Sequence, residues 1–247
     1  MLQQTQAGRV VPKWSEFIAR WPTPADCAAA PASDVVRAWS GLGYNRRALN
    51  LHRCATEVVA RHGGQLPGHE NELRALPGIG PYTARAVLAF AFGHDVAALD
   101  TNITRVVTRA AIGQPASPRD VQAVADKLIG SGEGWAWNQA AMDLGAGICT
   151  ARQPRCQACP LNAGCRWRRH GGPDPAARRP RQKAFQGSDR QGRGRLLAAL
   201  SHGPVDFPNG LGPATGWPDD AARAERVAQQ IVSEGFATVN GAALVLS

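Results

Sequence analysis

The sequence predicts a mainly α-helical protein that ends in a small α+β module. Three observations predict this class. Apolar side chains recur at helical spacing through residues 1–165, four cysteines lie within residues 149–165, and helical and hairpin patterns follow residue 185. At 247 residues, the chain has room for one large domain or two modest ones, each with its own apolar core.

Helical spacing begins close to the N-terminus, where the first apolar stripe consists of Val10, Val11, Trp14, Phe17 and Ile18. A second stripe follows Ser33, whose hydroxyl is a candidate N-cap, and consists of Val35, Val36 and Trp39. A third stripe is followed by Gly63 and Gly64, which suit a helix C-terminus, and consists of Ala48, Leu51, Ala55, Val58 and Val59. The N-terminal part is therefore expected to be almost continuously helical.

The middle of the chain predicts four more helices. The first, over residues 84–92, is rich in small side chains and can pack closely against a neighbour. The others are expected over residues 102–112, 118–130 and 136–147, with Ser117 as the N-cap of the second of these.

The composition changes after Cys165, where Lys, Arg, Gly and Pro become frequent. This predicts a basic linker over residues 168–184, either a solvated connector or an arm that contacts phosphates. Residues 185–247 then predict two helices, around 196–200 and 221–232, and a hairpin with a type I′ turn at Asn240–Gly241. Helices followed by a hairpin resemble a winged helix.

The net charge of +9 favours a polyanionic partner such as nucleic acid, with an ordinary basic protein as the alternative. No run of about 18 apolar residues predicts a membrane span. The N-terminus lacks the pattern of a signal peptide, so a cytoplasmic protein is expected, associated with the nucleoid in a bacterium. The clustered cysteines favour a metal site in a reducing compartment, and Cys27 and Cys54 are expected to be small core residues.

A glycine-rich loop, Pro77-Gly78-Ile79-Gly80, lies between two helical patterns, and Pro81 suits the first position of the second helix. Glycine permits positive φ and lets a ligand approach the backbone closely. The amides at the following helix start form an anion site, so this helix-hairpin-helix loop is expected to bind a DNA phosphate. The alternative is an ordinary connector between helices.

Asp100 ends an apolar segment and precedes a predicted helix. As an N-cap, its carboxylate would accept hydrogen bonds from the following amides. The same carboxylate, placed beside a sugar, can stabilise the oxocarbenium-like charge of glycosidic bond cleavage. Both roles are compatible, and the cap is the simpler interpretation from this residue alone.

The spacing Cys149-x6-Cys156-x2-Cys159-x5-Cys165 is typical of an iron–sulfur ligand set. Four thiolates also suit a structural zinc ion. Zinc ribbons usually contain two C-x2-C pairs, whereas this segment has one, so the pattern favours iron–sulfur.

Six ordered strings resemble the adenine DNA glycosylase (MutY) family, within the endonuclease III helix-hairpin-helix superfamily. They are residues 1–6, 39–44, 76–84, 99–102 and 138–145 and the four cysteines. The resemblance covers about two-thirds of the chain and leaves out the C-terminal module. It implies a helix-hairpin-helix DNA glycosylase core over residues 1–97 and a [4Fe-4S] cluster domain over 98–167. The separate winged-helix-like module over 185–247 is predicted from its own pattern of helices and hairpin.

The resemblance also implies roles for particular residues. Asp100 matches the catalytic aspartate, Asn102 matches a polar neighbour, and Gln3 and Gln4 match residues that probe the lesion and fill the stack left by the flipped base. Tyr44 matches an aromatic wedge on the opposite strand, while Gly78, Gly80 and Thr83 belong to the DNA-binding hairpin. The four cysteines match the ligands of a [4Fe-4S] cluster.

Tyr82 stands where bifunctional relatives carry a lysine that forms a Schiff base with the sugar. A phenol forms no imine, so we expect a monofunctional enzyme. The resemblance implies that it removes adenine opposite 8-oxoguanine or guanine in double-stranded DNA, and we expect it to be a monomer. The alternatives are a mismatch thymine or uracil glycosylase and a non-catalytic, redox-sensitive DNA-binding protein. Asn45 and Arg46 differ from the residues most common at these positions in the adenine glycosylase family.

Two departures concern the ends of the chain. The family's general-acid glutamate lies two residues before the methionine that matches Met1, so we expect this chain to lack that acid, and with it part of its activity. Residues 185–247 are too short for the Nudix-like module that recognises 8-oxoguanine in many relatives. Recognition of the oxidised base is then expected to depend on Gln3, Gln4, Tyr44 and the C-terminal module.

Overall fold

The computed structural model describes residues 1–176 and 184–247, which form two units by their internal contacts. The first unit contains Met1–Leu66, Leu76–Gly78 and the described C-terminal residues. The second contains Pro67–Ala75 and the residues from Ile79 to 176. Both are mainly helical, as predicted. In the described part of the chain, no helix is long and apolar enough to cross a membrane.

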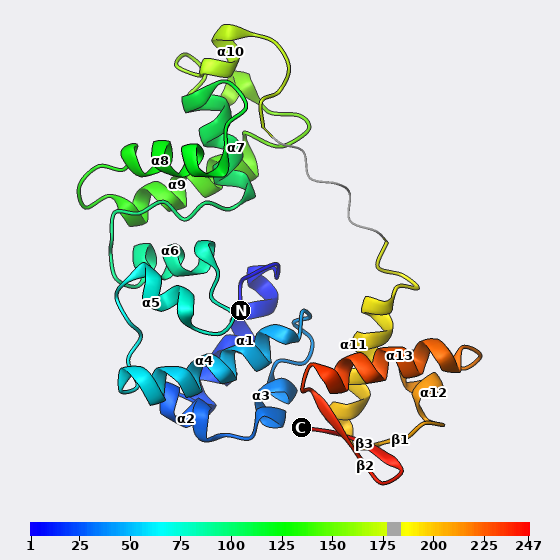
Figure 1. The fold of residues 1–247 in the computed structure, drawn as a ribbon. Helices are drawn as coiled ribbons and strands as arrows, with labels where there is room; N and C mark the ends of the chain where they lie inside the picture. The colour runs from blue at the N-terminus through cyan, green and yellow to red at the C-terminus, as the bar shows by residue number, and fades with distance from the viewer. Residues whose placement is uncertain (177–183) are drawn as a thin grey trace. The chain divides into compact units, whose positions relative to one another are not determined.

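The N-terminal part of the first unit consists of four helices, α1 (Ala7–Arg20), α2 (Pro24–Ala29), α3 (Ala32–Ala38) and α4 (Arg46–His62). Helices α2 and α3 pack against α4 (Figure 1). Helix α2 begins with a reciprocal cap, in which Thr23 and Asp26 each accept a hydrogen bond from the other's backbone amide. Helix α3 begins at Ala32 after Pro31, so the expected cap at Ser33 was placed two residues too late.

Only part of the apolar face of helix α1 is buried. Its Val10 and Phe17 are buried, whereas the neighbouring stripe of the same predicted helix is exposed by 42–59%, namely Val11, Trp14 and Ile18. Helix α4 ends as expected, because Gly63 adopts φ of 60° and its amide hydrogen-bonds the carbonyl oxygen of Val58.

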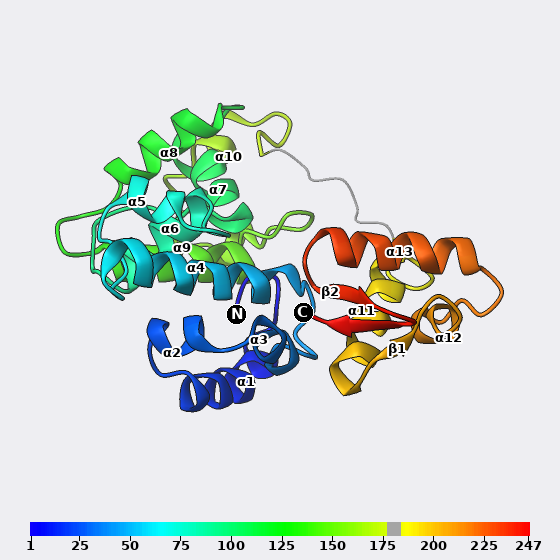
Figure 2. The ribbon, with the colours of Figure 1, turned by 60° about the horizontal axis from the view of Figure 1, so that its bottom comes forward.

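The C-terminal module of the first unit has the order helix, strand, two helices and hairpin. Its elements are α11 (Asp189–His202), β1 (Val205–Asp206), α12 (Leu211–Thr215), α13 (Ala221–Ser233), β2 (Ala237–Asn240) and β3 (Ala243–Leu246). The strands form an antiparallel sheet in the order β1-β3-β2, next to α11 and α13 (Figure 2). This arrangement is winged-helix-like, as predicted, although β1 and α12 were not predicted.

The hairpin turn differs from the prediction. Asn240 pairs with Ala243, so the two central residues are Gly241 and Ala242 rather than Asn240 and Gly241. Gly241 has φ of 58°, whereas Ala242 does not adopt positive φ. A type I′ turn needs positive φ at both central residues, so the type I′ prediction was wrong; glycine at the first central position is typical of type II′.

The apolar core of the first unit includes side chains from both the N-terminal helices and the C-terminal module, among them Trp39, Leu49, Leu200, Ile231 and Phe236. Each of these is exposed by 3% or less. Burying a side chain of this size contributes about 1.5–3 kcal/mol. Cys27 and Cys54 are buried in this unit, as expected for small core residues.

The second unit consists of α5 (Glu70–Ala75), α6 (Pro81–Phe90), α7 (Thr101–Val107), a π-helical turn η1 (Thr108–Ile112), α8 (Pro118–Lys127), α9 (Gly134–Gly147), a 3₁₀ turn η2 (Cys156–Ala158) and α10 (Arg166–His170). Helices α6 and α7 pack against α9, and α10 packs against η1 (Figure 1). Ser117 caps α8 as predicted, since its hydroxyl accepts a hydrogen bond from the amide of Asp120. Residues 168–170 of the expected basic linker belong to α10, and residues 177–183 of it lie outside the described part.

Candidate active site and metal centre

Asp100 is the N-cap of α7. Its carboxylate oxygen accepts hydrogen bonds from the amides of Asn102, at 2.8 Å, and Ile103, at 2.7 Å. Amides at a helix start favour a negative charge at this position. The capping role expected from the sequence is therefore confirmed, and the carboxylate is only partly exposed.

The segment that leads into Asp100 is fixed by buried polar side chains. Asn138 is fully buried in α9, accepts from the amide of Ala98 at 2.8 Å and donates to the carbonyl oxygen of Val96 at 2.8 Å. The amide of Ala97 donates to Asp126 at 2.9 Å, and its carbonyl oxygen accepts from Arg85 at 2.7 Å. These side chains form hydrogen bonds with the backbone amides and carbonyl oxygens of a segment that is not part of a sheet. They thereby fix the position of Asp100, which follows this segment.

Tyr82 lies in the first turn of α6 and is brought close to Asp100 within the second unit. Burial, and next the negative charge of Asp100, raise the pKa of the Tyr82 phenol above its usual value of 10.0. The phenol is therefore neutral at physiological pH. Thr83 follows in the same turn and is half-buried.

Asn102 is the second residue of α7 and is hydrogen-bonded to Arg105, a residue that the sequence did not single out. Arg105 donates to the Asn102 side-chain oxygen at 2.9 Å, to the Gly145 carbonyl at 2.7 Å and to the Cys149 carbonyl at 2.7 Å. A Cβ on Gly145 would lie 2.7 Å from the Asn102 Cβ, so α7 and α9 approach closely here. The three-residue spacing of Asn102 and Arg105 on one helix could have indicated from the sequence that these two side chains meet.

The glycine loop contains two glycines in different conformations. Gly78 has φ of 77°, and a Cβ there would lie 2.6 Å from the Cβ of Asn50 in the same unit. Gly80 is the N-cap of α6, with φ of −89° and open space around its Cβ position. Only Gly78 thus needs the left-handed region, whereas Gly80 leaves the helix start uncovered. Both glycines are exposed.

Gln3, Gln4 and Tyr44 lie together in the first unit, on two segments of backbone that share the guanidinium of Arg47. All three are exposed, Tyr44 by 50%. Gln4 and Tyr44 have positive φ, of 55° and 49°. Exposed residues in this sparsely populated conformation are often found at functional sites.

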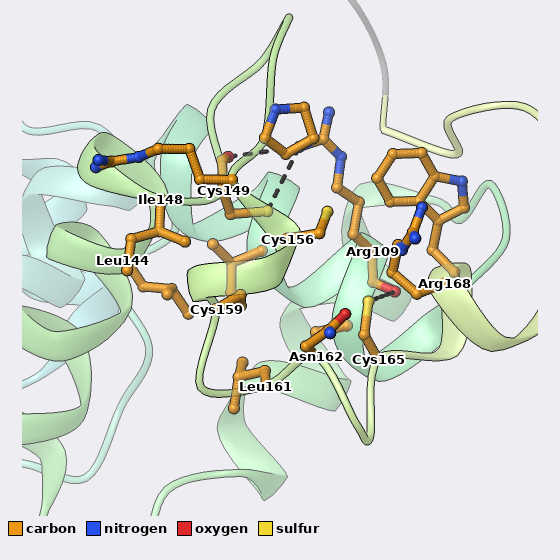
Figure 3. A pocket seen from close by; sticks show the side chains of 15 residues that line it. Arg109, Leu144, Ile148, Cys149, Cys156, Cys159, Leu161, Asn162, Cys165 and Arg168 are labelled. Atoms are coloured by element: carbon orange, nitrogen blue, oxygen red, sulfur yellow. Dashed lines mark hydrogen bonds between the residues drawn. The ribbon is translucent and has the colours of Figure 1, made fainter.

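The four cysteines of residues 149–165 line one cavity (Figure 3). None of the four forms a disulfide, and Cys165 is buried. Arg109, exposed by 1%, donates to the Cys149 sulfur at 3.4 Å (Figure 3). It also donates to the Thr150 carbonyl oxygen at 2.8 Å. Its backbone carbonyl lies 3.6 Å from the Cys165 sulfur.

Arg109 is itself held by Asp174, through two hydrogen bonds of 3.0 and 2.6 Å to the carboxylate. Its guanidinium also lies 4.8 Å from the ring centre of Trp167. Hydrogen bonding to Asp174 and Cys149 raises the pKa of Arg109 although burial acts in the opposite direction. Arg109 therefore keeps its positive charge beside the sulfur atom of Cys149.

The donor set fits an iron–sulfur cluster. Four cysteine sulfurs line one cavity, which suits a cluster in which each cysteine binds a different iron. Cys149, Cys156, Cys159 and Cys165 are the residues that would hold a [4Fe-4S] cluster here. A bound cluster cross-links the loop and can exchange an electron.

Comparisons with known proteins agree with this geometry. Residues 1–131 match the family described as HhH-GPD superfamily base excision DNA repair protein, and residues 149–165 match the iron-sulfur binding domain of endonuclease III. The adenine DNA glycosylase of Mycolicibacterium smegmatis is 43% identical over 96% of this chain and 80% of its own length. The adenine DNA glycosylase of Homo sapiens is 39% identical over 68% of this chain and 32% of its own length.

Solved structures show the same fold. A thermostable thymine-DNA glycosylase matches with a TM-score of 0.64 and 28% identity, over 69% of this chain and 81% of that protein. A trapped covalent complex of endonuclease III with DNA matches with a TM-score of 0.61 and 27% identity, over 68% and 80%. The fold and the cysteine site thus define a base-excision DNA repair protein of the HhH-GPD superfamily. Within it, the chain belongs to the adenine DNA glycosylase family.

Proposed function

We propose that this base-excision repair enzyme hydrolyses the N-glycosyl bond of adenine paired with 8-oxoguanine or guanine in double-stranded DNA. The observation that carries the proposal is the carboxylate of Asp100, fixed at the start of α7 and close to the Tyr82 phenol. A fixed negative charge stabilises the sugar cation that develops as the base departs. In this proposal Asp100 is the catalytic carboxylate, and Tyr82 and Asn102 line the site.

Tyr82 supports a monofunctional reaction. Its phenol is kept neutral by burial and by Asp100, and it has no amine with which to attack the sugar. Water is therefore the nucleophile, and the product is an abasic site with an intact strand.

The DNA contacts follow from the exposed segments. A glycosidic bond is unreachable inside a duplex, so the adenine has to leave the stack. Gln3, Gln4 and Tyr44 are exposed side chains on ordered backbone that can fill the space the base leaves. The amides that follow Gly78 and Gly80, with Thr83, are suited to a backbone phosphate.

The first test is single-turnover release of adenine from an A:8-oxoguanine duplex by the wild-type chain and by Asp100→Asn. Asparagine caps a helix about as well as aspartate, so the variant keeps its fold while losing the charge. We expect the rate to fall at least about 100-fold and the unfolding midpoint to stay near the wild-type value.

A T:G duplex and a borohydride trapping reaction serve as controls. Faster release of thymine than of adenine would assign the chain to mismatch thymine repair. A covalent adduct with DNA after borohydride treatment would contradict the monofunctional reaction. Adenine release that is insensitive to Asp100→Asn would remove Asp100 from the catalytic role.

A further inference from the structure

Arg47, in the first turn of α4, makes more contacts than any role in the helix requires. Its guanidinium donates to the carbonyl oxygens of Met1, at 2.7 Å, and Gln3, and to the Thr5 hydroxyl at 2.9 Å. It also donates to the carbonyl oxygen of Gly43 at 3.0 Å. One side chain therefore joins residues 1–5 to the loop before α4, two segments separated by about forty positions in the sequence.

The same guanidinium lies near two aromatic rings. It lies 5.1 Å from the ring centre of Trp39, which is buried, and 5.7 Å from that of Tyr44, which is half-exposed. Its Nε also lies 3.4 Å from the Tyr44 carbonyl oxygen. Arg47 thus contacts both the backbone and the ring of Tyr44.

Both segments carry an unusual backbone. Among residues 1–176 and 184–247, Gln4 and Tyr44 are the two non-glycine residues with positive φ. Such conformations persist only where the surroundings hold them. The two segments are also joined directly, because the Thr5 hydroxyl donates to the Leu42 carbonyl oxygen at 3.3 Å.

We propose that Arg47 is a positioning residue that holds Gln3, Gln4 and Tyr44 in the conformation that meets mispaired DNA, and thereby sets discrimination between mispair and ordinary duplex. The inference rests on the proposed function, because that function assigns these three side chains to DNA. Only arginine suits the position. Its planar fork presents five N–H donors, whereas lysine presents three from a single flexible point charge.

The test compares Arg47→Lys and Arg47→Gln with the wild-type chain, in full-length protein with its cluster loaded. Two quantities are measured: the ratio of Kd for an A:T duplex to Kd for an A:8-oxoguanine duplex, and the fluorescence of 2-aminopurine placed next to the mispair. We expect both variants to lower the Kd ratio at least about tenfold and to reduce the fluorescence rise on binding. Single-turnover release at saturating DNA should fall less than the ratio does.

Arg46→Gln is the matched control, because Arg46 is the neighbouring, exposed arginine on the same helix. Loss of its charge should weaken binding to both duplexes alike and leave their ratio unchanged. Thr5→Val, which removes a single link and keeps Arg47, provides a second variant should the Arg47 variants fold poorly. It should lower the ratio in the same direction by a smaller factor.

Gln4→Ala and Tyr44→Ala distinguish the proposed DNA contacts of these side chains from the positioning role of Arg47. A normal ratio in both would overturn the proposed DNA roles of these side chains. A lowered ratio in these variants, together with a normal ratio in Arg47→Lys and Arg47→Gln, would overturn the positioning role alone. Arg47 variants that weaken both duplexes equally, as Arg46→Gln does, would show that only the charge of Arg47 matters.

Discussion

The carboxylate of Asp100 affects the ionisation of the Tyr82 phenol, and this effect can be measured directly. Burial and the carboxylate of Asp100 raise the pKa of the Tyr82 phenol above 10.0. We predict that Asp100→Asn lowers this pKa towards the usual value without reaching it, because burial remains. The chain has two tyrosines, so the ultraviolet titration of Tyr82→Phe, subtracted from that of the wild type, isolates Tyr82.

The raised pKa also has a consequence for stability. Above pH 10.0 the unfolded chain releases the phenol proton while the folded chain retains it. The free energy of unfolding therefore falls as the pH rises from 10.0 to the folded-state pKa, and this contribution is complete below 10.0. Tyr82→Phe should remove this part of the alkaline decline. A titration of Tyr82 at or below 10.0 would contradict the placement of the two side chains.

The residue scale also shows what local sequence can predict. Asp100 was predicted as a cap because its partners, the amides of Asn102 and Ile103, are its immediate neighbours in the chain. Arg47 and Arg109 escaped prediction because each is defined by partners dozens of positions away. No periodicity indicates which of many arginines will be buried beside distant carbonyl oxygens or a distant carboxylate.

The helix-hairpin-helix element offers a matched pair of glycine variants. Gly78→Ala introduces a Cβ 2.6 Å from Asn50 at a φ of 77°, so both packing and backbone oppose it. We predict a loss of at least about 1–2 kcal/mol in the free energy of unfolding, measured by urea denaturation. Gly80→Ala meets open space at negative φ and should change that energy by less than about 1 kcal/mol.

Measuring DNA affinity distinguishes a role of this loop in phosphate binding from a role in stability alone. If the amides at the start of α6 receive a phosphate, the methyl group of Gly80→Ala should still weaken affinity for any duplex, while stability is nearly unchanged. Unaltered affinity of Gly80→Ala for DNA would argue against a phosphate at this helix start.

At the scale of elements, helices with long apolar stripes were predicted well, and short elements were not. Helices α4, α8 and α9 follow from spacing and caps that are local in the chain. The two-residue strand β1 exists only because it pairs with β3, some forty positions later. The hairpin turn was misplaced by one residue because strand register, set by the core side chain of Leu244, determines which residues occupy the turn.

At the scale of the molecule, local patterns give little information about how the chain is divided. The expected boundary between residues 97 and 98 followed the Asp100 motif, and it stays a prediction. The contacts group Ile79 onward with the cysteine loop, while Leu76–Gly78 belong with the N-terminal helices. Such grouping arises from packing between distant segments, which periodicity does not encode.

The second unit contains a segment with little structure of its own. Between Cys149 and Cys165 the regular structure is one 3₁₀ turn, and the following helix α10 has five residues. A helix that short is unstable in isolation. The Arg109–Asp174 pair and the contact of α10 with η1 hold this segment, and a cluster bound by the four cysteines would cross-link it. The cluster is thus expected to contribute most of the local folding energy.

We therefore predict that removing the cluster loosens this segment before the rest of the protein. In hydrogen exchange, residues 149–170 and η1 of the cluster-free protein should lose protection, while α4 in the first unit keeps it. Cys156→Ala should produce the same pattern together with loss of visible absorbance and bound iron. Cys54→Ala is the control. Burial, and then the nearby Cys27, raise the pKa of Cys54 to about 11, and Cys54 does not line the cavity of the four cysteines. Loss of colour in Cys54→Ala, or unchanged exchange after removal of the cluster, would contradict this account, because the segment would then fold without the metal.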